Sequence, residues 1–317
     1  MKTKYKYKMK KIIATVAAVV IALGSAYAQD LAQITEMYNN GAAAISTDKA
    51  AALSYFEQAL KAAEALGDEG KDVVANCKNI IPSINLSMAK DLVKSASYDE
   101  AVAQLNKAVE VAKNYSAEDV AAEAESLVPQ VIMQKGNSLL NNKDYAGAAA
   151  AYKSITESDP TNGAAYVRLG AALNGAGDSE GAVAAFEKAM ENGQEATAKK
   201  QLANIYLKNA AADLKTKGYA NAVEAALKSY EYGGNAQALQ VAGQASQLAG
   251  KNNDAIKYFE QYLEAAPNAS NAGQIAYTVG ALYQTAKNTA KAKEYYQKAS
   301  TDPKYGAEAK KLLDALK

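Results

Sequence analysis

Three glycines, Gly170, Gly175 and Gly177, lie in the otherwise apolar stretch YVRLGAALNGAGDSEGAVAAFEKA, residues 166–189. Glycines at this density are found in loops that bind phosphate groups. A Walker-type loop, however, requires Gly-x-x-x-x-Gly-Lys-Ser/Thr after a strand, whereas Gly175 is followed by Ala176 and Gly177. The spacing also fails the dinucleotide pattern Gly-x-Gly-x-x-Gly. The sequence therefore predicts no nucleotide-binding site here.

The titratable residues restrict catalysis further. Histidine is absent, which removes Ser-His-Asp and Cys-His nucleophiles, imidazole acid–base catalysis and His-ligated metal sites. The 34 Asp and Glu residues offer acid–base pairs, but most lie beside Lys in helix-like segments such as FEKAMENG and KEYYQKA. No loop has the alternating Asp/Asn pattern and closing Glu of a calcium site. We expect a protein that is not an enzyme and that binds no cofactor and no metal.

Cysteine and tyrosine each leave two interpretations. The single cysteine, Cys77, cannot form an internal disulfide; it is a buried helix residue or, without a supporting motif, a reactive or intermolecularly bonded thiol. Tyr is far commoner than Phe, with 21 residues against 3. We expect five tyrosines of the second helices to fill the core with their hydroxyls near water: Tyr152, Tyr258, Tyr262, Tyr295 and Tyr296. In the alternative interpretation, exposed tyrosines contact glycans or peptides.

The first 28 residues have the pattern of a secretory signal peptide. Six Lys precede an apolar run from Ile12 to Leu23, and Ala26-Tyr27-Ala28 is a small-x-small cleavage site. We predict cleavage between Ala28 and Gln29. The alternative, an uncleaved anchor, needs an apolar run of about 20 residues, and this run is shorter. The protein is predicted to be exported, as a periplasmic, envelope-associated or secreted protein.

The charge of the remaining chain argues against nucleic acid as a partner. Removal of residues 1–28 takes away six Lys and no acidic residue, so the net charge falls from +1 to about −5. The chain also has one Arg and no basic patch, which is not the electrostatic footprint of a nucleic-acid-binding protein. No later segment is apolar enough to cross a membrane, and the sequence gives no indication of the oligomeric state.

A repeat underlies the chain. GNSLLNNKDYAGAAAAY, residues 136–152, aligns at an offset of 34 with GAALNGAGDSEGAVAAF, residues 170–186. Each stretch predicts two short helices, with the second pair at about 164–174 and 180–192. Gly175 and Gly177 are placed in the turn between them, and Asp178 or Ser179 is placed as the helix cap. The aligned identical or similar pairs are Gly136 with Gly170, Leu139 with Leu173, Asp144 with Asp178, Gly147 with Gly181, Ala148 with Ala182, and Tyr152 with Phe186.

These units resemble tetratricopeptide repeats: Gly or Ala lies midway along the first helix, Ala lies early in the second, and an aromatic residue follows four positions later. The resemblance implies an all-α solenoid of helical hairpins, wound as a right-handed superhelix of five to seven repeats over residues 29–304. Residues 305–317 are predicted to form a capping helix. Gly67–Asp72 and Pro82 are predicted break points where the repeat spacing is long. The landmark alanines are Ala52, Ala101, Ala148, Ala182, Ala222, Ala255 and Ala292.

The resemblance also implies a concave groove lined by the first helices, where a peptide would bind. It places Met133, Asn137, Val167, Tyr277 and Gln284 there. Gln237, Gln240, Gln244 and Gln247 fall three, four and three residues apart, so their amides share one helix face and are candidates for binding a partner's backbone. The alternative is that these Gln residues only solvate the helix.

The sequence thus favours a non-catalytic scaffold or adaptor of a bacterial cell envelope, with a protein or peptide partner in the groove. A second hypothesis is a constitutive subunit of an outer-membrane or envelope assembly complex. A third, from another class, is a glycan-binding or hydrolytic protein built on helical repeats, for which the sequence shows no cluster of carboxylates. The identity of the partner does not follow from the sequence.

Overall fold

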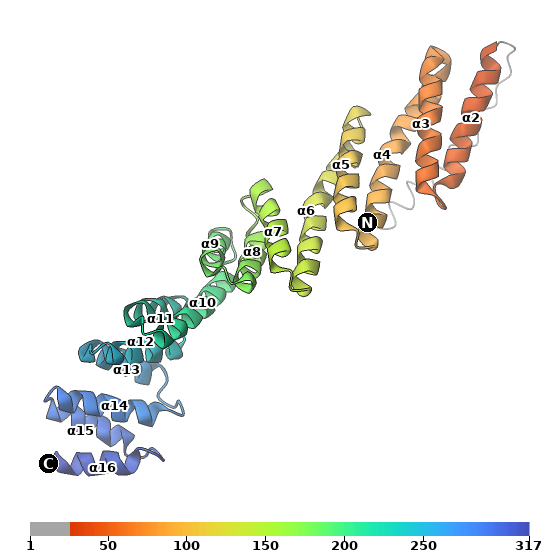
Figure 1. Ribbon diagram of the computed structural model, residues 1–317. Coiled ribbons are helices and arrows are strands. Elements are labelled where there is room, and N and C mark those ends of the chain that lie inside the picture. The colour runs from red at the N-terminus through yellow and green to blue at the C-terminus, as the bar shows by residue number, and fades with distance from the viewer. Residues whose placement is uncertain (1–25, 317) are drawn as a thin grey trace. The chain divides into compact units, whose positions relative to one another are not determined.

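The computed structural model describes residues 26–316, which form fifteen α-helices and one 3-10 helix, with no strand among them. The chain divides into two compact units, and unit 1 ends at Asn142. Each unit is a succession of antiparallel helices that pack against their neighbours along the chain (Figure 1). Unit 1 contains α2 (Ala26–Ala44), α3 (Lys49–Ala65), η2 (Gly67–Gly70), α4 (Lys71–Lys94), α5 (Tyr98–Asn114) and α6 (Glu118–Asn141).

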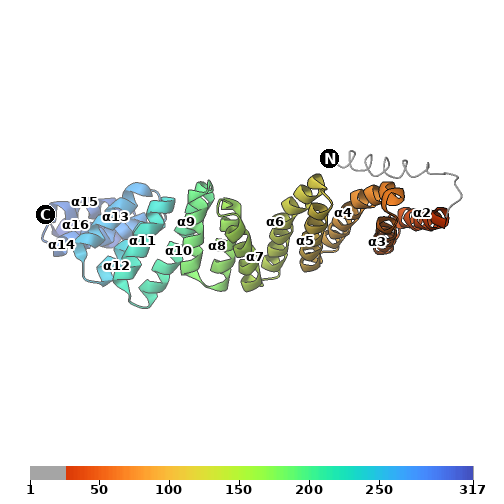
Figure 2. The ribbon, with the colours of Figure 1, turned by 90° about the horizontal axis from the view of Figure 1, so that it is seen from above.

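Unit 2 begins at Lys143 and carries most of the predicted site residues. Its helices also follow one another in chain order, as the second view shows (Figure 2). They are α7 (Tyr145–Ser158), α8 (Gly163–Ala176), α9 (Ser179–Glu191), α10 (Glu195–Lys215), α11 (Tyr219–Gly233), α12 (Ala236–Leu248), α13 (Asn252–Ala265), α14 (Ala272–Thr285), α15 (Thr289–Ala299) and α16 (Gly306–Ala315).

The predicted all-α hairpin architecture is confirmed. In the part of the chain that the structure describes, six hairpins lie within the units: α2–α3, α4–α5, α8–α9, α10–α11, α12–α13 and α14–α15. All seven landmark alanines are fully buried, because only a methyl group fits where two helices of a hairpin approach closely. Helix α16 covers the last hairpin, with Ala309 buried and Leu312, Leu313 and Leu316 packed against the core of α13–α15.

The glycines of the opening stretch are packing and turn residues. A Cβ added at Gly170 would lie 2.9 Å from the Phe186 ring, so glycine lets α8 approach α9. Gly177 ends α8 in the left-handed region with φ +88°, which glycine adopts without strain. The prediction that Gly175 belongs to the turn is wrong, since α8 continues to Ala176. Gly175 instead gives close approach to Tyr145, whose ring would lie 2.5 Å from an added Cβ.

The long repeat spacings come from long first helices. Helices α4 and α6 have 24 residues each and α10 has 21, against 14 in α8 and α14. Ion pairs join the extended ends to the preceding helix, with Lys78–Glu64 at 2.9 Å between α4 and α3. A corresponding pair joins α6 to α5, Glu125–Lys113 at 2.7 Å. Here the acidic residue is on the long helix and the lysine is on the preceding helix, the reverse of the first pair.

Proline does not break the long helices. The predicted break at Gly67–Asp72 is present as the 3-10 helix η2, but Pro82 lies inside α4, and the prediction of a break there is wrong. Pro82 is the twelfth residue of α4, as Pro129 is of α6. A proline in a helix removes one backbone hydrogen bond. Burial of Ile80 and Ile84 on either side stabilises the helix through that position.

The predicted signal segment lies mostly outside the part of the chain that the structure describes. Residues 1–25 lie outside the described residues, so most of the predicted signal segment does too, while Ala26–Ala28 form the start of α2. No helix of the described part is both long and apolar enough to span a bilayer.

Cys77 is fully buried in the core of α2–α4, and burial raises the pKa of its thiol to about 12. It is therefore protonated at neutral pH and unreactive.

Candidate functional site

The predicted site residues lie on first helices of the hairpins, but in both units. Met133 and Asn137 are half-buried residues of α6 in unit 1, whereas all the others belong to unit 2. Within unit 2, α10 contacts both α8 and α12, and Asn271 at the start of α14 donates a hydrogen bond to Gln240 of α12. We give the name first-helix face of unit 2 to the following residues of these four helices: Val167, Asn204, Leu207, Gln237, Gln240, Gln244, Gln247, Tyr277 and Gln284.

The glutamine stripe on α12 forms the centre of this face. Gln237 and Gln247 are exposed and Gln240 and Gln244 are half-buried, while the opposite side of α12 is buried in the core through Leu239 and its neighbours. The predicted common helix face is therefore real. Among the described residues the side chains of Gln237, Gln244 and Gln247 make no hydrogen bond, so these amides are directed to solvent or to a partner.

Gln240 has an additional, intramolecular role. Its Oε1 accepts a hydrogen bond of 3.0 Å from Nδ2 of Asn271, at the start of α14. The Oδ1 of Asn271 in turn accepts from the hydroxyl of Tyr262 on α13. This chain of three side chains fixes the Gln240 amide and joins α12, α13 and α14. Gln240 therefore positions neighbouring helices, a role that the sequence did not indicate.

The C-terminal end of the face is more tightly packed than predicted. Tyr277 lies 5.8 Å from Tyr296 and 5.4 Å from Tyr305, measured between ring centroids. Gln284 accepts a hydrogen bond of 2.6 Å from the Tyr296 hydroxyl. Both residues thus take part in the packing of α14 against α15 and α16. Val167 on α8 is likewise half-buried, against the cluster that contains Phe186.

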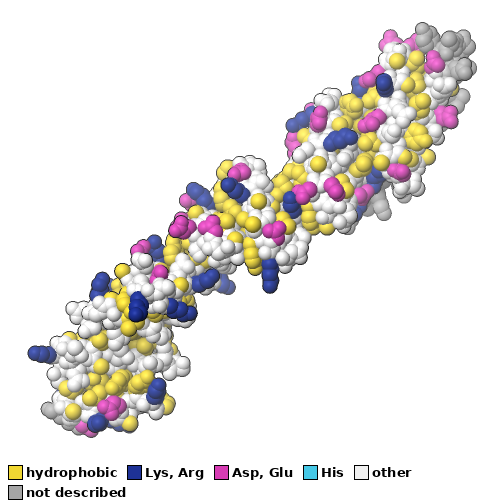
Figure 3. Space-filling model, viewed as in Figure 1, with side chains coloured by type: hydrophobic (Ala, Val, Ile, Leu, Met, Phe, Trp, Pro, Cys, Tyr) yellow, Lys and Arg dark blue, Asp and Glu magenta, His cyan; other side chains and the backbone are white. Residues whose placement is uncertain are grey.

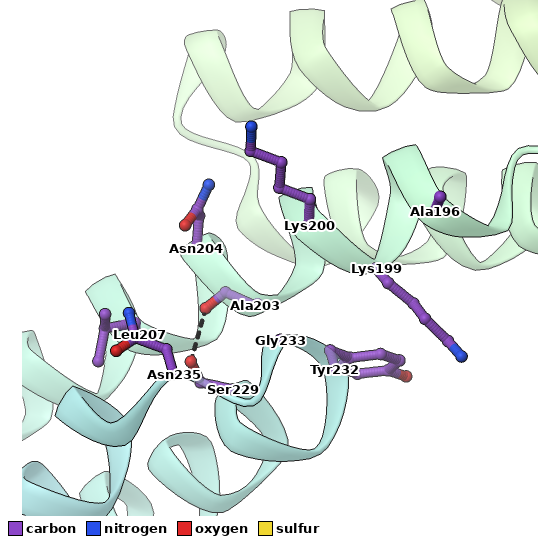
Figure 4. A pocket seen from close by; sticks show the side chains of 10 residues that line it. All are labelled: Ala196, Lys199, Lys200, Ala203, Asn204, Leu207, Ser229, Tyr232, Gly233 and Asn235. Atoms are coloured by element: carbon purple, nitrogen blue, oxygen red, sulfur yellow. Dashed lines mark hydrogen bonds between the residues drawn. The ribbon is translucent and has the colours of Figure 1, made fainter. Parts of the chain in front are cut away.

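A pocket of about 410 Å³ lies beside the stripe, between α10, the end of α11 and the start of α12 (Figure 4). Its walls carry Lys199, Lys200, Asn204, Tyr232 and Asn235. The residue pattern of the sequence does not predict this pocket. The one signal was the spacing of 40 residues between Ala182 and Ala222, which reflects the longer α10.

The pocket has a rigid aromatic wall and a cationic rim. Tyr232 stacks on Tyr206 with ring centroids 5.8 Å apart and an interplanar angle of 5°, and burial raises the pKa of its phenol. Lys199 pairs with Glu195 at 2.6 Å. The lining of the pocket contains Lys199 and Lys200 and no Asp or Glu. Figure 3 shows Lys, Arg and acidic side chains on one face of the molecule.

A second polar cluster holds α13, α14 and α15 together. The hydroxyls of Tyr283 and Tyr295 both donate to Oε1 of Glu260, at 2.7 and 2.9 Å, and Nζ of Lys298 lies 4.3 Å from the Tyr295 ring centroid. Tyr295 is buried, as are Tyr152, Tyr262 and Tyr296, while Tyr258 is half-buried. These four buried tyrosines of the second helices are therefore core residues, as the sequence predicts, whereas Tyr55 and Tyr230 of other second helices are exposed.

This cluster predicts a loss of stability at alkaline pH. Burial, followed by the hydrogen bond to Glu260, raises the pKa of Tyr283 to about 12, above the ordinary value of about 10. The folded state favours the protonated phenol, so its contribution to stability is complete below pH 10 and lost as pH rises through 12. Ultraviolet titration of the phenolates should show a late step that loses amplitude in Tyr283→Phe, while Tyr295, whose pKa is also raised by burial and by Glu260, still titrates late. A late step of unchanged amplitude in that variant would contradict the assignment.

Comparison with known proteins identifies the repeats. Sequence models described as tetratricopeptide repeat match residues 133–197, 236–269 and 273–301. No curated protein sequence matches the chain.

In the residues that the structure describes, there is no group of three or more His, Cys, Asp or Glu side chains arranged to hold a metal ion.

Solved structures with similar helical arrangements share little sequence with this chain. A crystal structure of the MamA protein has 20% identity over 58% of this chain and 96% of its own, with a TM-score of 0.37. A pilF structure from Pseudomonas aeruginosa has 18% identity over 59% of this chain and 82% of its own, with a TM-score of 0.29. The TPR2AB-domain:pHSP90-complex of yeast Sti1 has 16% identity over 74% and 96%, with a TM-score of 0.31.

Proposed function

Since the chain belongs to the tetratricopeptide-repeat family, we propose that it is a non-catalytic scaffold that binds a peptide or protein segment on the first-helix face of unit 2. The tetratricopeptide repeats support protein–protein interaction as the general function. The choice of this face is a proposal that rests on the glutamine stripe of α12. Catalysis has no part in the proposed function.

The observation that carries the proposal is the difference between the glutamines of this face. Gln240 and Gln284 accept hydrogen bonds from neighbouring helices, whereas Gln237, Gln244 and Gln247 make no side-chain hydrogen bond within the described part of the chain. An amide side chain has both a donor and an acceptor, which matches the peptide backbone of an extended partner. The tethered glutamines keep the helices in place while the others face the partner.

The proposed cellular location rests on the N-terminal sequence alone. The Lys-rich start, the apolar run and the small-x-small site support export and cleavage between Ala28 and Gln29. The partner would then be a protein of a bacterial cell envelope or of its exterior. Mass determination of the N-terminus after expression in a bacterial host checks the cleavage, and a mature chain that retains residues before Gln29 would overturn this location.

Site-specific photo-crosslinking tests the proposed face. A photo-reactive residue at Gln237 or Gln247 should capture a protein partner in cells, because both positions are exposed at the centre of the face. Gln261 on α13 is an exposed glutamine of a second helix and serves as the matched control. Capture from Gln237 and Gln247 but not from Gln261 supports the proposal. Capture from Gln261 alone would place the interface on the second helices and favour a constitutive subunit of an assembly complex.

The alternative of a glycan-binding or hydrolytic protein has weaker support. It relies on exposed tyrosines or clustered carboxylates. The hydroxyls of Tyr262, Tyr295 and Tyr296 are engaged with Asn271, Glu260 and Gln284, so they contribute to packing. The scaffold function therefore accounts for more of the structure.

A further inference from the structure

The outward side of α2 is polar. Gly41 of α2 lies against the Phe56 ring, so it holds the place that Gly170 has in α8. Three residues of α8 at fixed distances from that glycine are buried, whereas their counterparts in α2 are exposed. They are Ala165, Leu169 and Ala172 in α8, and Glu36, Asn40 and Ala43 in α2. The terminal unit of a repeat array has such a polar outer face, so α2 is the N-terminal cap of the array.

The start of α2 makes few core contacts. Among its described side chains Ile34 is the first that is buried, with 3% exposure, and Asp30 and Gln33 before it are exposed. The predicted cleavage after Ala28 makes Gln29 the first residue of the mature chain, within α2. The new terminus then precedes the first core residue by five positions, so packing does not prevent a reaction there.

A glutamine at a chain terminus can react with itself, because its α-amine and its side-chain amide close a five-membered ring. The neutral amine attacks Cδ, the bond between the α-nitrogen and Cδ forms, and the Cδ–Nε2 bond breaks. One amine proton passes to Nε2, which leaves as ammonia. The reaction needs no oxidant, reductant or second substrate. Its product is a pyroglutamyl residue, whose lactam carries no charge at the chain terminus.

The place of Gln29 at a helix start favours this product. The N-terminal end of a helix carries a partial positive charge, so a protonated α-amine is unfavourable there and a neutral lactam is not. The first N–H groups of a helix have no intrahelical acceptor, so ring closure removes no helix hydrogen bond. The ring of proline is well tolerated at the first helical position, and the lactam ring has the same size. Cyclisation therefore stabilises the start of α2.

We propose that Gln29 is converted to pyroglutamate once the signal segment is removed, and that this modification completes the N-terminal cap of the array. Aminopeptidases that require a free α-amine then have no substrate at this end of the chain. The proposal rests on the proposed cellular location, because Gln29 has a free amine only after cleavage. The modified residue is separate from the first-helix face of unit 2.

Mass spectrometry of the protein purified after export tests the modification. During incubation at physiological temperature the mature chain should lose the mass of one ammonia, and fragment ions of its N-terminal peptide should place the loss at residue 29. The fractional rate should not depend on protein concentration, because the reaction is intramolecular. Pyroglutamyl aminopeptidase should remove one residue, after which N-terminal sequencing begins at Asp30. A terminus that keeps its free amine throughout overturns the proposal.

Gln29→Asn is the matched control. Its amide is one methylene shorter, so attack by its own amine would require a four-membered ring. The variant should therefore keep a free amine, which N-terminal sequencing detects, and its mass shows whether it is cleaved at the same bond. A blocked terminus in this variant would show that the modification is not ring closure by Gln29.

Amide hydrogen exchange measures the effect on α2. The N–H groups of residues 33–36 bond the carbonyls one turn earlier. In the cyclised protein they should exchange about twofold to fivefold more slowly than in the uncyclised protein. The difference should shrink at high salt, and α14 should exchange equally in both forms. Equal exchange of residues 33–36 in the two forms overturns the stabilising role of the lactam.

This proposal and the proposed location fail in different ways. A mature chain that retains residues before Gln29 rejects the location, and the modification with it. A mature chain that begins at Gln29 and keeps its free amine rejects only the modification. The location and the first-helix face are then unaffected.

Discussion

Replacement of Phe259 by Ala is expected to lower the free energy of unfolding of unit 2 by about 3–5 kcal/mol. Phe259 is 1% exposed and its ring fills the space between α13 and Gly243 of α12. Removal of the ring loses its burial from water and leaves a cavity that the rigid helices cannot close. Urea denaturation of the full chain measures the change.

The location of the effect distinguishes lost packing from general damage. In repeat arrays each hairpin interacts with its neighbours, so amide hydrogen exchange should accelerate in α12, α13 and α14, whereas α3 and α4 of unit 1 should be unaffected. Tyr230→Ala is the control, because Tyr230 is an exposed aromatic residue of unit 2, and it should change stability by less than about 0.5 kcal/mol. A loss below about 1 kcal/mol in Phe259→Ala would contradict the packing described here.

The second large effect is expected for the glycine opposite this ring. A Cβ at Gly243 would lie 2.5 Å from two atoms of the Phe259 ring, and the ring is enclosed. Gly243→Val should therefore destabilise unit 2 by about 2–3 kcal/mol, although valine is the better helix former. Thermal and urea unfolding measure this loss. Gln247→Val places the same side chain at an exposed position of α12 and should cost only a few tenths of a kcal/mol.

A double-mutant cycle verifies that the clash causes the loss. Leu at position 259 is smaller than Phe, so Gly243→Val combined with Phe259→Leu should be more stable than the two separate losses predict, by about 0.5–3 kcal/mol. Strict additivity would show that position 243 is sensitive for another reason. The corresponding pairs Gly170–Phe186 and Gly280–Tyr296 have similar geometry, and the same result is expected there.

The hairpin architecture was predictable because it depends on local and periodic features. The glycine and alanine positions, the following aromatic residues and the helix caps all recur along the chain, and each acts within one hairpin. Asp178, for example, accepts a hydrogen bond from the N–H of Gly181 at 2.9 Å, as its spacing predicts. The exceptions have physical reasons. Burial on both sides of Pro82 keeps α4 continuous, and the Tyr145 ring extends the packing of α8 to Gly175.

The candidate site was predictable only in part. The spacing of Gln237 to Gln247 placed them on one helix face, but it could not show which of the amides are committed within the protein. Gln240 accepts from Asn271, 31 residues away, and Gln284 accepts from Tyr296 on the next helix. Such contacts depend on how separate helices pack. The sequence around each glutamine therefore does not indicate its hydrogen-bond partner.

The sequence by itself determined the all-α repeat architecture, the positions of closest helix contact and the amide stripe, because a fixed period and small residues at fixed places leave one way to bury the apolar faces. Only the tertiary structure decided which glutamines are tethered and that a pocket exists. The length of α10 was visible as a repeat spacing. The pocket also requires that Ser229 and Gly233 of α11 contact Ala203 of α10. These contacts are determined by the packing of the two helices in three dimensions.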